Sequence, residues 1–240
     1  MYDFSKMTKK DFGKFFDYSV LPKQSTEADI IKGCKEAIEY NCAAFYPNSN
    51  YWVPLVKDLL KGFGVLTATT FDFPFGTATP KMKGIMAEEA VELGAESIDM
   101  VMNIGALRSG RIDDVKEELR LVKAAIPQDV LSKCILEVEF LTDDEIKRAA
   151  TMVAEAGFDY VKTASGQFAG MNMDQFLIMK NAVAGSKTKS KVAGVKFPRP
   201  QNAYAFIMAG ADLIGTRAAP EILDHLDMMR EIGLVPKYEG

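Results

Sequence analysis

Short apolar runs alternate with amphipathic segments along all 240 residues of the chain. Between the apolar runs, apolar residues recur three and four positions apart, which predicts helices over 26–40, 86–95, 113–126 and 143–157. Eight strand–helix units close into a barrel, whereas five or six form an open doubly wound sheet. No G-x-G-x-x-G motif follows any run, so we predict a (β/α)8 TIM barrel. The predicted strands begin at Cys42, Val65, Ser97, Cys134, Asp159, Val192 and Ala211, with a weaker eighth from Lys14 to Val20.

Local signals favour one continuous domain over residues 1–240. Thr26 with Asp29, and Thr142 with Glu145, have the spacing of helix-capping boxes. The densest cluster of turn residues, 186–191, is short enough to be a loop between a helix and a strand. No low-complexity linker interrupts the pattern.

Charge and cysteine usage exclude several classes of function. The net charge of −4 and the pI of about 5.3 leave no global basic field for nucleic acid or anionic lipid. Three cysteines without C-x-x-C spacing indicate reduced core thiols rather than disulfides or a zinc site, and the single histidine, His225, argues against metal ligation. No leader or membrane span is evident, so we expect a cytoplasmic protein. As a separate expectation, the protein requires no metal or organic cofactor.

In a barrel, chemistry takes place at the C-terminal ends of the strands. Glu137 and Glu139 are two positions apart, so we expect them on one face of a strand, as a polar pair near Lys162 and Lys196. Polar residues at the predicted strand ends are Asp17, Tyr46, Asp72, Asp99, Asn103, Glu137, Glu139, Lys162, Thr163, Lys196, Thr216 and Arg217.

Two lysines at the ends of apolar strands suggest amine chemistry. Lys162 and Lys196 would be neighbours on strands six and seven, where each cation disfavours protonation of the other. A nucleophilic lysine must be neutral, which requires its pKa to fall by about three units, or roughly 4 kcal/mol. Asp99 could move protons at such a site. The alternative is that each lysine reaches solvent or pairs with a carboxylate, and that Asp99 caps a loop.

The motifs of this chain resemble those of the deoxyribose-phosphate aldolases. The likeness covers FDYSVL, FDFPFG, SIDMVMNIGALRSG, LEVEFLTDDEI, YVKTASG, AGVK and AGADLIGTRAAPEIL, in the family's order. The resemblance implies a class I aldolase that cleaves 2-deoxyribose 5-phosphate to glyceraldehyde 3-phosphate and acetaldehyde. It assigns the Schiff base to Lys162, the perturbing cation to Lys196 and proton relay to Asp99, with Asp17 and Ser19 near a substrate hydroxyl.

The phosphate-binding segments depart from the family pattern. Where the family has a Gly-Gly turn after the second lysine, FPRPQNA follows Lys196, and TRAAP replaces the Gly-x-Ser-Ser segment. Arginines can bind phosphate or carboxylate through paired donors, or they can simply be solvated. The substrate-binding candidates are Asp17, Ser19, Thr163, Gly166, Arg199, Gly215 and Arg217.

Three functions remain open at this stage. The first is aldol cleavage of deoxyribose 5-phosphate. The second is a Schiff-base aldolase for a carboxylated or non-phosphorylated substrate, and the third is a non-catalytic barrel that binds a sugar phosphate or a protein. The expected partner is a small aldehyde or a molecule like a sugar phosphate, and a homodimer is possible.

Overall fold

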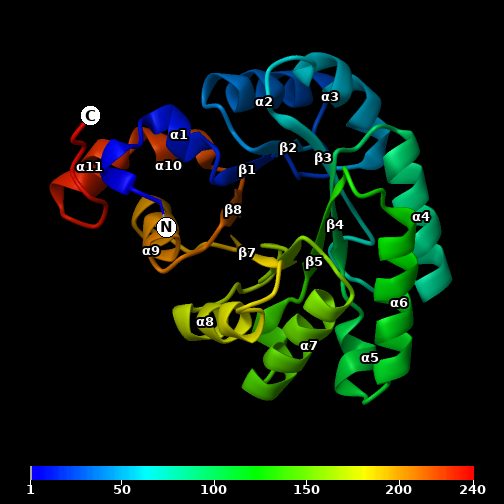
Figure 1. The fold of residues 1–240 in the computed structure, drawn as a ribbon. Coiled ribbons are helices and arrows are strands. Elements are labelled where there is room, and N and C mark those ends of the chain that lie inside the picture. Colours follow the sequence, from blue (N-terminus) through cyan, green and yellow to red (C-terminus); the bar gives the residue numbers. More distant parts are fainter. Residues whose placement is uncertain (1) are drawn as a thin grey trace.

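Eight parallel strands close into a barrel in the computed structural model, which describes residues 2–240. Each strand pairs with the next along the chain, and β1 pairs with β8, so the predicted TIM barrel is confirmed (Figure 1). The strands are β1 (Phe16–Ser19), β2 (Ala44–Tyr46), β3 (Leu66–Phe71), β4 (Ser97–Val101), β5 (Leu131–Ile135), β6 (Tyr160–Lys162), β7 (Lys189–Ala193) and β8 (Leu213–Thr216).

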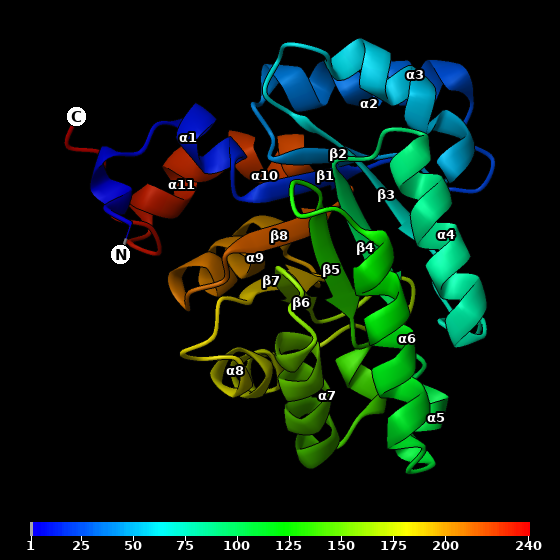
Figure 2. The same ribbon diagram turned by 45° about the vertical axis from the view of Figure 1, so that its right-hand side comes forward.

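Helices cover the outside of this barrel (Figures 1 and 2). The capping boxes predicted at Thr26 and Thr142 are both present, and they begin α2 and α7. The α-helices are α1 (Lys9–Gly13), α2 (Glu27–Glu39), α3 (Val53–Leu60), α4 (Pro80–Glu92), α5 (Ile104–Arg108), α6 (Ile112–Ala125), α7 (Asp143–Glu155), α8 (Met173–Ala182), α9 (Arg199–Met208), α10 (Ala219–Asp224) and α11 (Leu226–Glu231). The 3-10 helices are η1 (Phe4–Lys6), η2 (Asn50–Trp52) and η3 (Val138–Phe140).

The seventh strand begins earlier than the sequence pattern predicts. β7 starts at Lys189, within the segment expected to be a loop, and it ends at Ala193. Gly194 then turns the chain with a φ of 79°. Lys191 therefore lies within the strand, whereas Lys196 lies on the loop that follows it.

The fifth strand is also shifted toward the N-terminus. It ends at Ile135, and Glu137 has a left-handed backbone with a φ of 53° before η3 begins. The expectation that Glu137 and Glu139 share one face of a strand was wrong, because the chain has already left the sheet at these residues.

A buried ion pair joins α4 to α6. Lys83 and Glu118 are 0% and 1% exposed, and Lys83 Nζ lies 2.7 Å from Glu118 Oε2. The same ammonium donates to the carbonyl oxygens of Val101 at 2.8 Å and Gly76 at 3.0 Å. The pair thereby fixes the loop between β3 and α4, which carries Phe73 to the mouth of the barrel.

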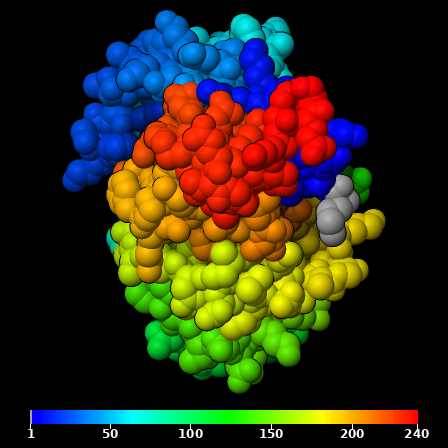
Figure 3. All heavy atoms as spheres, turned by 90° about the vertical axis from the view of Figure 1, so that its left-hand side faces the viewer, coloured from blue at the N-terminus to red at the C-terminus, as the bar shows by residue number. Residues whose placement is uncertain are grey.

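The two ends of the chain lie side by side (Figure 3). The Glu239 amide donates to the Ser5 carbonyl at 2.8 Å, and the Arg230 guanidinium lies 5.1 Å from the centre of the Tyr238 ring. Tyr238 thus packs against Arg230 of α11, and the neighbouring Glu239 joins the C-terminal segment to the N-terminal one. In residues 2–240, none of the helices is long and apolar enough to cross a membrane.

Candidate active site

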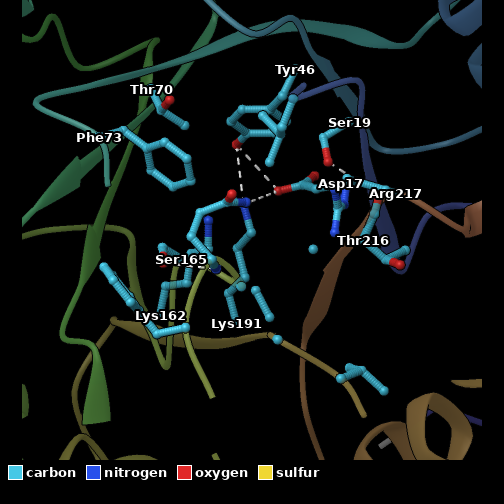
Figure 4. A pocket seen from close by; sticks show the side chains of 18 of the residues that line it. Asp17, Ser19, Tyr46, Thr70, Phe73, Lys162, Ser165, Lys191, Thr216 and Arg217 are labelled. Atoms are coloured by element: carbon cyan, nitrogen blue, oxygen red, sulfur yellow. Dashed lines mark hydrogen bonds and ion pairs between the residues drawn. The ribbon is translucent and has the colours of Figure 1, made fainter. Parts of the chain in front are cut away.

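A cavity of about 220 Å³ opens at the C-terminal ends of the strands, where the barrel rule places a site. Figure 4 shows that Lys162 and Lys191 approach it from β6 and β7, and Tyr46, Asp17 and Ser19 from β1 and β2. Its walls are formed by Asp17, Ser19, Leu21, Tyr46, Thr70, Phe73, Lys162, Ser165, Gly166, Gln167, Phe168, Ala169, Lys191, Ala193, Gly194, Val195, Lys196, Arg199, Gly215, Thr216 and Arg217.

Lys162 is the last residue of β6 and is 6% exposed. Its Nζ lies 2.8 Å from Asp99 Oδ2. Burial lowers the pKa of Lys162 to about 8, because desolvation disfavours the ammonium. The positive charge of Lys191 acts in the same direction, and the carboxylate of Asp99 opposes both. The neutral form of this amine is therefore far more populated near neutral pH than in an ordinary lysine.

Lys191, rather than Lys196, is the barrel neighbour of Lys162. Its Nζ lies 2.8 Å from the same Asp99 oxygen and 2.7 Å from Asp17 Oδ2. Burial acts against its charged form, but the two carboxylates outweigh burial and raise the pKa of Lys191. The side chain of Lys196 is exposed and lines the outer part of the cavity. The predicted neighbour was wrong because β7 ends at Ala193, before Lys196.

A third lysine completes the charged network at the floor of the site. Lys133 on β5 is 1% exposed, and its Nζ lies 2.6 Å from Asp17 Oδ2. Tyr46 Oη donates to Asp99 Oδ1 at 2.8 Å and accepts from Lys133 at 3.0 Å. The sequence analysis listed Tyr46 as a strand-end candidate without a specific role, and it did not single out Lys133. The available signal was a charged residue inside the apolar run of β5.

The charges in this network balance when Lys162 is neutral. Burial disfavours the ionised form of Asp99, but Lys162 and Lys191 hold its pKa well below the usual range. The pKa of Asp17 is also lowered, since Lys133 and Lys191 outweigh burial. Two carboxylates then face three lysines, so the charges balance only if one amine is neutral. Burial lowers the pKa of both Lys162 and Lys133, and of these two only Lys162 lines the cavity.

The predicted arginines line the mouth of the cavity. Arg217 follows β8, and its guanidinium has no hydrogen bond or ion pair to any other residue between 2 and 240. The guanidinium of Arg199 lies 4.1 Å from the centre of the Phe197 ring and 3.9 Å from Glu221 Oε2. Together with Lys196, the two arginines make the mouth positively charged.

The other predicted substrate-binding residues occupy different places. Ser19, Gly166 and Gly215 line the cavity, and a Cβ at Gly215 would lie only 3.1 Å from Lys191 Cε. Thr163 is buried beneath it, where Oγ1 donates to the Ala193 carbonyl at 3.1 Å and links β6 to β7. Thr163 therefore lies outside the cavity lining.

The described residues, 2–240, contain no cluster of three or more His, Cys, Asp or Glu side chains suited to a metal ion. The chemical groups at the cavity are a buried amine, ionised carboxylates and a cationic mouth. An electrophilic carbonyl is the group that such an amine attacks.

Comparison with known proteins points to carbon–carbon bond cleavage. A family model described as DeoC/LacD family aldolase matches residues 13–220. A deoxyribose-phosphate aldolase from Caldicellulosiruptor saccharolyticus is 39% identical over 220 residues, covering 90% of this chain and 99% of that protein. The crystal structure of a putative deoxyribose-phosphate aldolase from Coccidioides immitis matches with a TM-score of 0.86 and 28% identity, covering 92% and 88% of the two chains. The structure of QR15, an aldolase, matches with a TM-score of 0.83 and 29% identity, covering 93% and 99%.

Proposed function

Because the chain belongs to the DeoC/LacD family of aldolases and is a class I aldolase, an aldehyde-lyase, we propose that Lys162 forms the Schiff base with its substrate. The observation that carries this proposal is the position of Lys162, which is buried at the cavity beside Asp99, the carboxylate that also binds Lys191, with its pKa lowered to about 8. The neutral amine attacks the aldehyde carbon to give a carbinolamine, which loses water to give an iminium ion.

The iminium ion then acts as an electron sink, which allows the bond between carbons 2 and 3 of the substrate to break. Removal of the proton from the hydroxyl on carbon 3 breaks the bond between carbons 2 and 3 and releases the acceptor aldehyde. The electron pair of that bond forms an enamine on Lys162. Protonation of the enamine carbon and hydrolysis of the new iminium release acetaldehyde and restore the amine. These transfers require a group that exchanges protons beside Lys162, and Asp99 is the nearest carboxylate.

Asp17 is proposed to orient the substrate rather than to take its proton. Its Oδ2 is bound by Lys133 and Lys191, while its buried Oδ1 has no hydrogen-bond partner in residues 2–240. A buried carboxylate oxygen without a partner is costly, so a substrate hydroxyl or a water is expected to bind there. Ser19 lies on the same strand and faces the same cavity.

We propose that the substrate is a 2-deoxy aldose phosphate, as for the relative from Caldicellulosiruptor saccharolyticus, whose name is deoxyribose-phosphate aldolase. Its anionic end would lie at the cationic mouth, against Arg217, Lys196 and Arg199. Guanidinium groups bind phosphate through two parallel hydrogen bonds. The arginines would thereby replace the family's Gly-Gly and Gly-x-Ser-Ser segments, which this chain lacks. They bind carboxylate in the same way, so a carboxylated sugar derivative is the second candidate.

Borohydride trapping tests the proposed function. We expect reduction in the presence of acetaldehyde to fix a two-carbon adduct on Lys162, detectable by peptide mass spectrometry. Lys162→Ala should abolish cleavage and trapping while the barrel stays folded. Cleavage assays with deoxyribose 5-phosphate, deoxyribose and a carboxylated analogue then identify the substrate class. An unmodified Lys162 under these conditions would refute the Schiff base.

We also propose that the protein works as a homodimer in the cytoplasm. The support for the compartment is that Cys34, Cys42 and Cys134 are all buried free thiols, as expected where disulfides do not form. Light scattering of the purified protein measures the oligomeric state directly.

A further inference from the structure

Two glutamates that follow β5 bind the backbone of the loop that follows β6. Glu137 Oε1 accepts a hydrogen bond from the Ser165 amide at 2.7 Å. Glu139 Oε1 accepts one from the Gly170 amide at 2.8 Å. The second oxygen of each carboxylate is buried and has no partner in the part of the chain that the structure describes. We call Glu137 and Glu139 the carboxylate latch.

The latch holds the two ends of a segment that forms one wall of the cavity. Every residue from 165 to 169 lines the cavity, and Gln167, Phe168 and Ala169 are exposed. Within this wall the Gln167 amide donates to Ser165 Oγ at 3.1 Å, a contact internal to the segment. The shape of the wall therefore depends strongly on its two anchored ends.

The wall is also packed against its neighbours at the Glu139 end. Gly170 has a φ of 78°, and a Cβ there would lie 2.6 Å from the Gly194 carbonyl oxygen. The Phe168 ring lies 5.3 Å from that of Phe140, edge to face, and Phe140 directly follows Glu139. The short η3 segment thus supplies both a hydrogen bond and an aromatic contact to the wall.

We propose that Glu139 is a positioning residue that determines specificity for the acceptor aldehyde. It fixes Phe168 and the rest of the wall against the part of the substrate that departs on cleavage. Lys162 is held separately, by Asp99 on β4, so the donor half of the reaction does not depend on this contact. The inference rests on the proposed Schiff-base function and adds a determinant of substrate binding to it.

The test compares binding of the whole substrate with reactivity toward the small donor. Glu139→Ala should raise KM for the best cleavage substrate about tenfold, the effect of losing one hydrogen bond to a charged group, with little change in kcat. Borohydride trapping of acetaldehyde on Lys162 should proceed at the wild-type rate. Glu139→Gln keeps an acceptor oxygen and should restore KM, and Glu155→Ala, at the exposed end of α7, is the matched control.

Two results would overturn the proposal. One is an unchanged KM in folded Glu139→Ala, and the other is an equal loss of trapping and cleavage, which would make the contact part of the general architecture. If Glu139→Ala does not fold, Phe168→Ala tests the proposal instead, because it removes the side chain of the wall directly. This variant must then raise KM without changing kcat or the trapping of acetaldehyde. Failure of the wild-type protein to trap acetaldehyde would instead refute the Schiff base itself.

Discussion

At the scale of single residues, the reactivity of Lys162 depends on the cation beside it. Lys191→Met removes that charge and leaves Asp99 to stabilise the ammonium of Lys162. The pKa of Lys162, now about 8, should rise by about one unit or more. Because the neutral amine is the nucleophile, the acid limb of the kcat/KM profile moves to higher pH, and activity at pH 7 falls about tenfold per unit.

Two further variants control this measurement. Lys191→Arg keeps a cation and should leave the acid limb near its wild-type position. Lys196→Met removes an exposed lysine that the sequence placed beside Lys162, and it should leave the limb unmoved. A shift in Lys196→Met without one in Lys191→Met would return the perturbing role to Lys196. Circular dichroism establishes that each variant is folded.

Asp99→Asn should shift the profile in the opposite direction. The carboxylate of Asp99 raises the pKa of Lys162, so its removal lowers that pKa and moves the acid limb to lower pH. At its own optimum the variant should be slower by about 100-fold, the scale of a lost proton-transfer group. Asp113→Asn, an exposed change on α6, is the control. A normal rate with a shifted limb would show that Asp99 tunes Lys162 without transferring protons.

Arg217→Ala tests the cationic mouth. If Arg217 binds the anionic end of the substrate, KM should rise about tenfold or more, since charge-assisted hydrogen bonds are among the strong ones. Inorganic phosphate should inhibit the wild-type enzyme and inhibit the variant less. Arg199→Ala should have a smaller effect, because Arg199 already contacts Phe197 and Glu221. Arg148→Ala, on the exposed face of α7, serves as the control; equal KM values for it and Arg217→Ala would exclude anion binding at Arg217.

At the scale of secondary structure, the hydrophobic pattern was sufficient to predict eight strands and the main helices. It could not place strand ends, because a lysine inside a barrel strand looks like a residue of a polar loop. Lys189 and Lys191 lie within the cluster of Ser, Thr and Lys residues at 186–191, so its turn-like composition predicted a loop there. Their side chains differ only in tertiary surroundings, since Lys191 meets two carboxylates from other strands.

Backbone conformation at the strand ends was equally hidden from the pattern. The run CILEVEF reads as one extended strand, yet Glu137 has a positive φ and redirects the chain into η3. The hydrogen bond from the Ser165 amide stabilises this conformation, and Ser165 is 28 residues away in the sequence. Nothing local to Glu137 encodes such a contact. This irregular end nevertheless matters for function, because Glu137 anchors the start of the segment 165–169, which forms a wall of the cavity.

At the scale of the whole molecule, the Lys83–Glu118 pair links α4, α6 and two loops at the mouth of the barrel. Lys83→Met leaves Glu118 buried without its partner, and an unpaired buried charge costs about 3–5 kcal/mol. For a domain of this size, the melting temperature should fall by about 10 °C. Lys81→Met, exposed on the same helix, should change it little. Thermal unfolding followed by circular dichroism measures both.

The pH dependence of this loss distinguishes a charge effect from simple loss of packing. Burial raises the pKa of Glu118, while Lys83 lowers it, so removing Lys83 should raise it further. A carboxyl group whose pKa is raised in the folded state takes up a proton as the pH falls, and the neutral form tolerates burial. The loss of stability caused by Lys83→Met, relative to the wild-type protein, should therefore be smaller near pH 5 than near pH 8. Adding Glu118→Gln, which can still accept the Asn103 amide, should recover part of the stability at pH 8. A deficit that is independent of pH and unchanged in the double variant would mean that the lost packing of the lysine side chain, rather than its charge, holds these helices together.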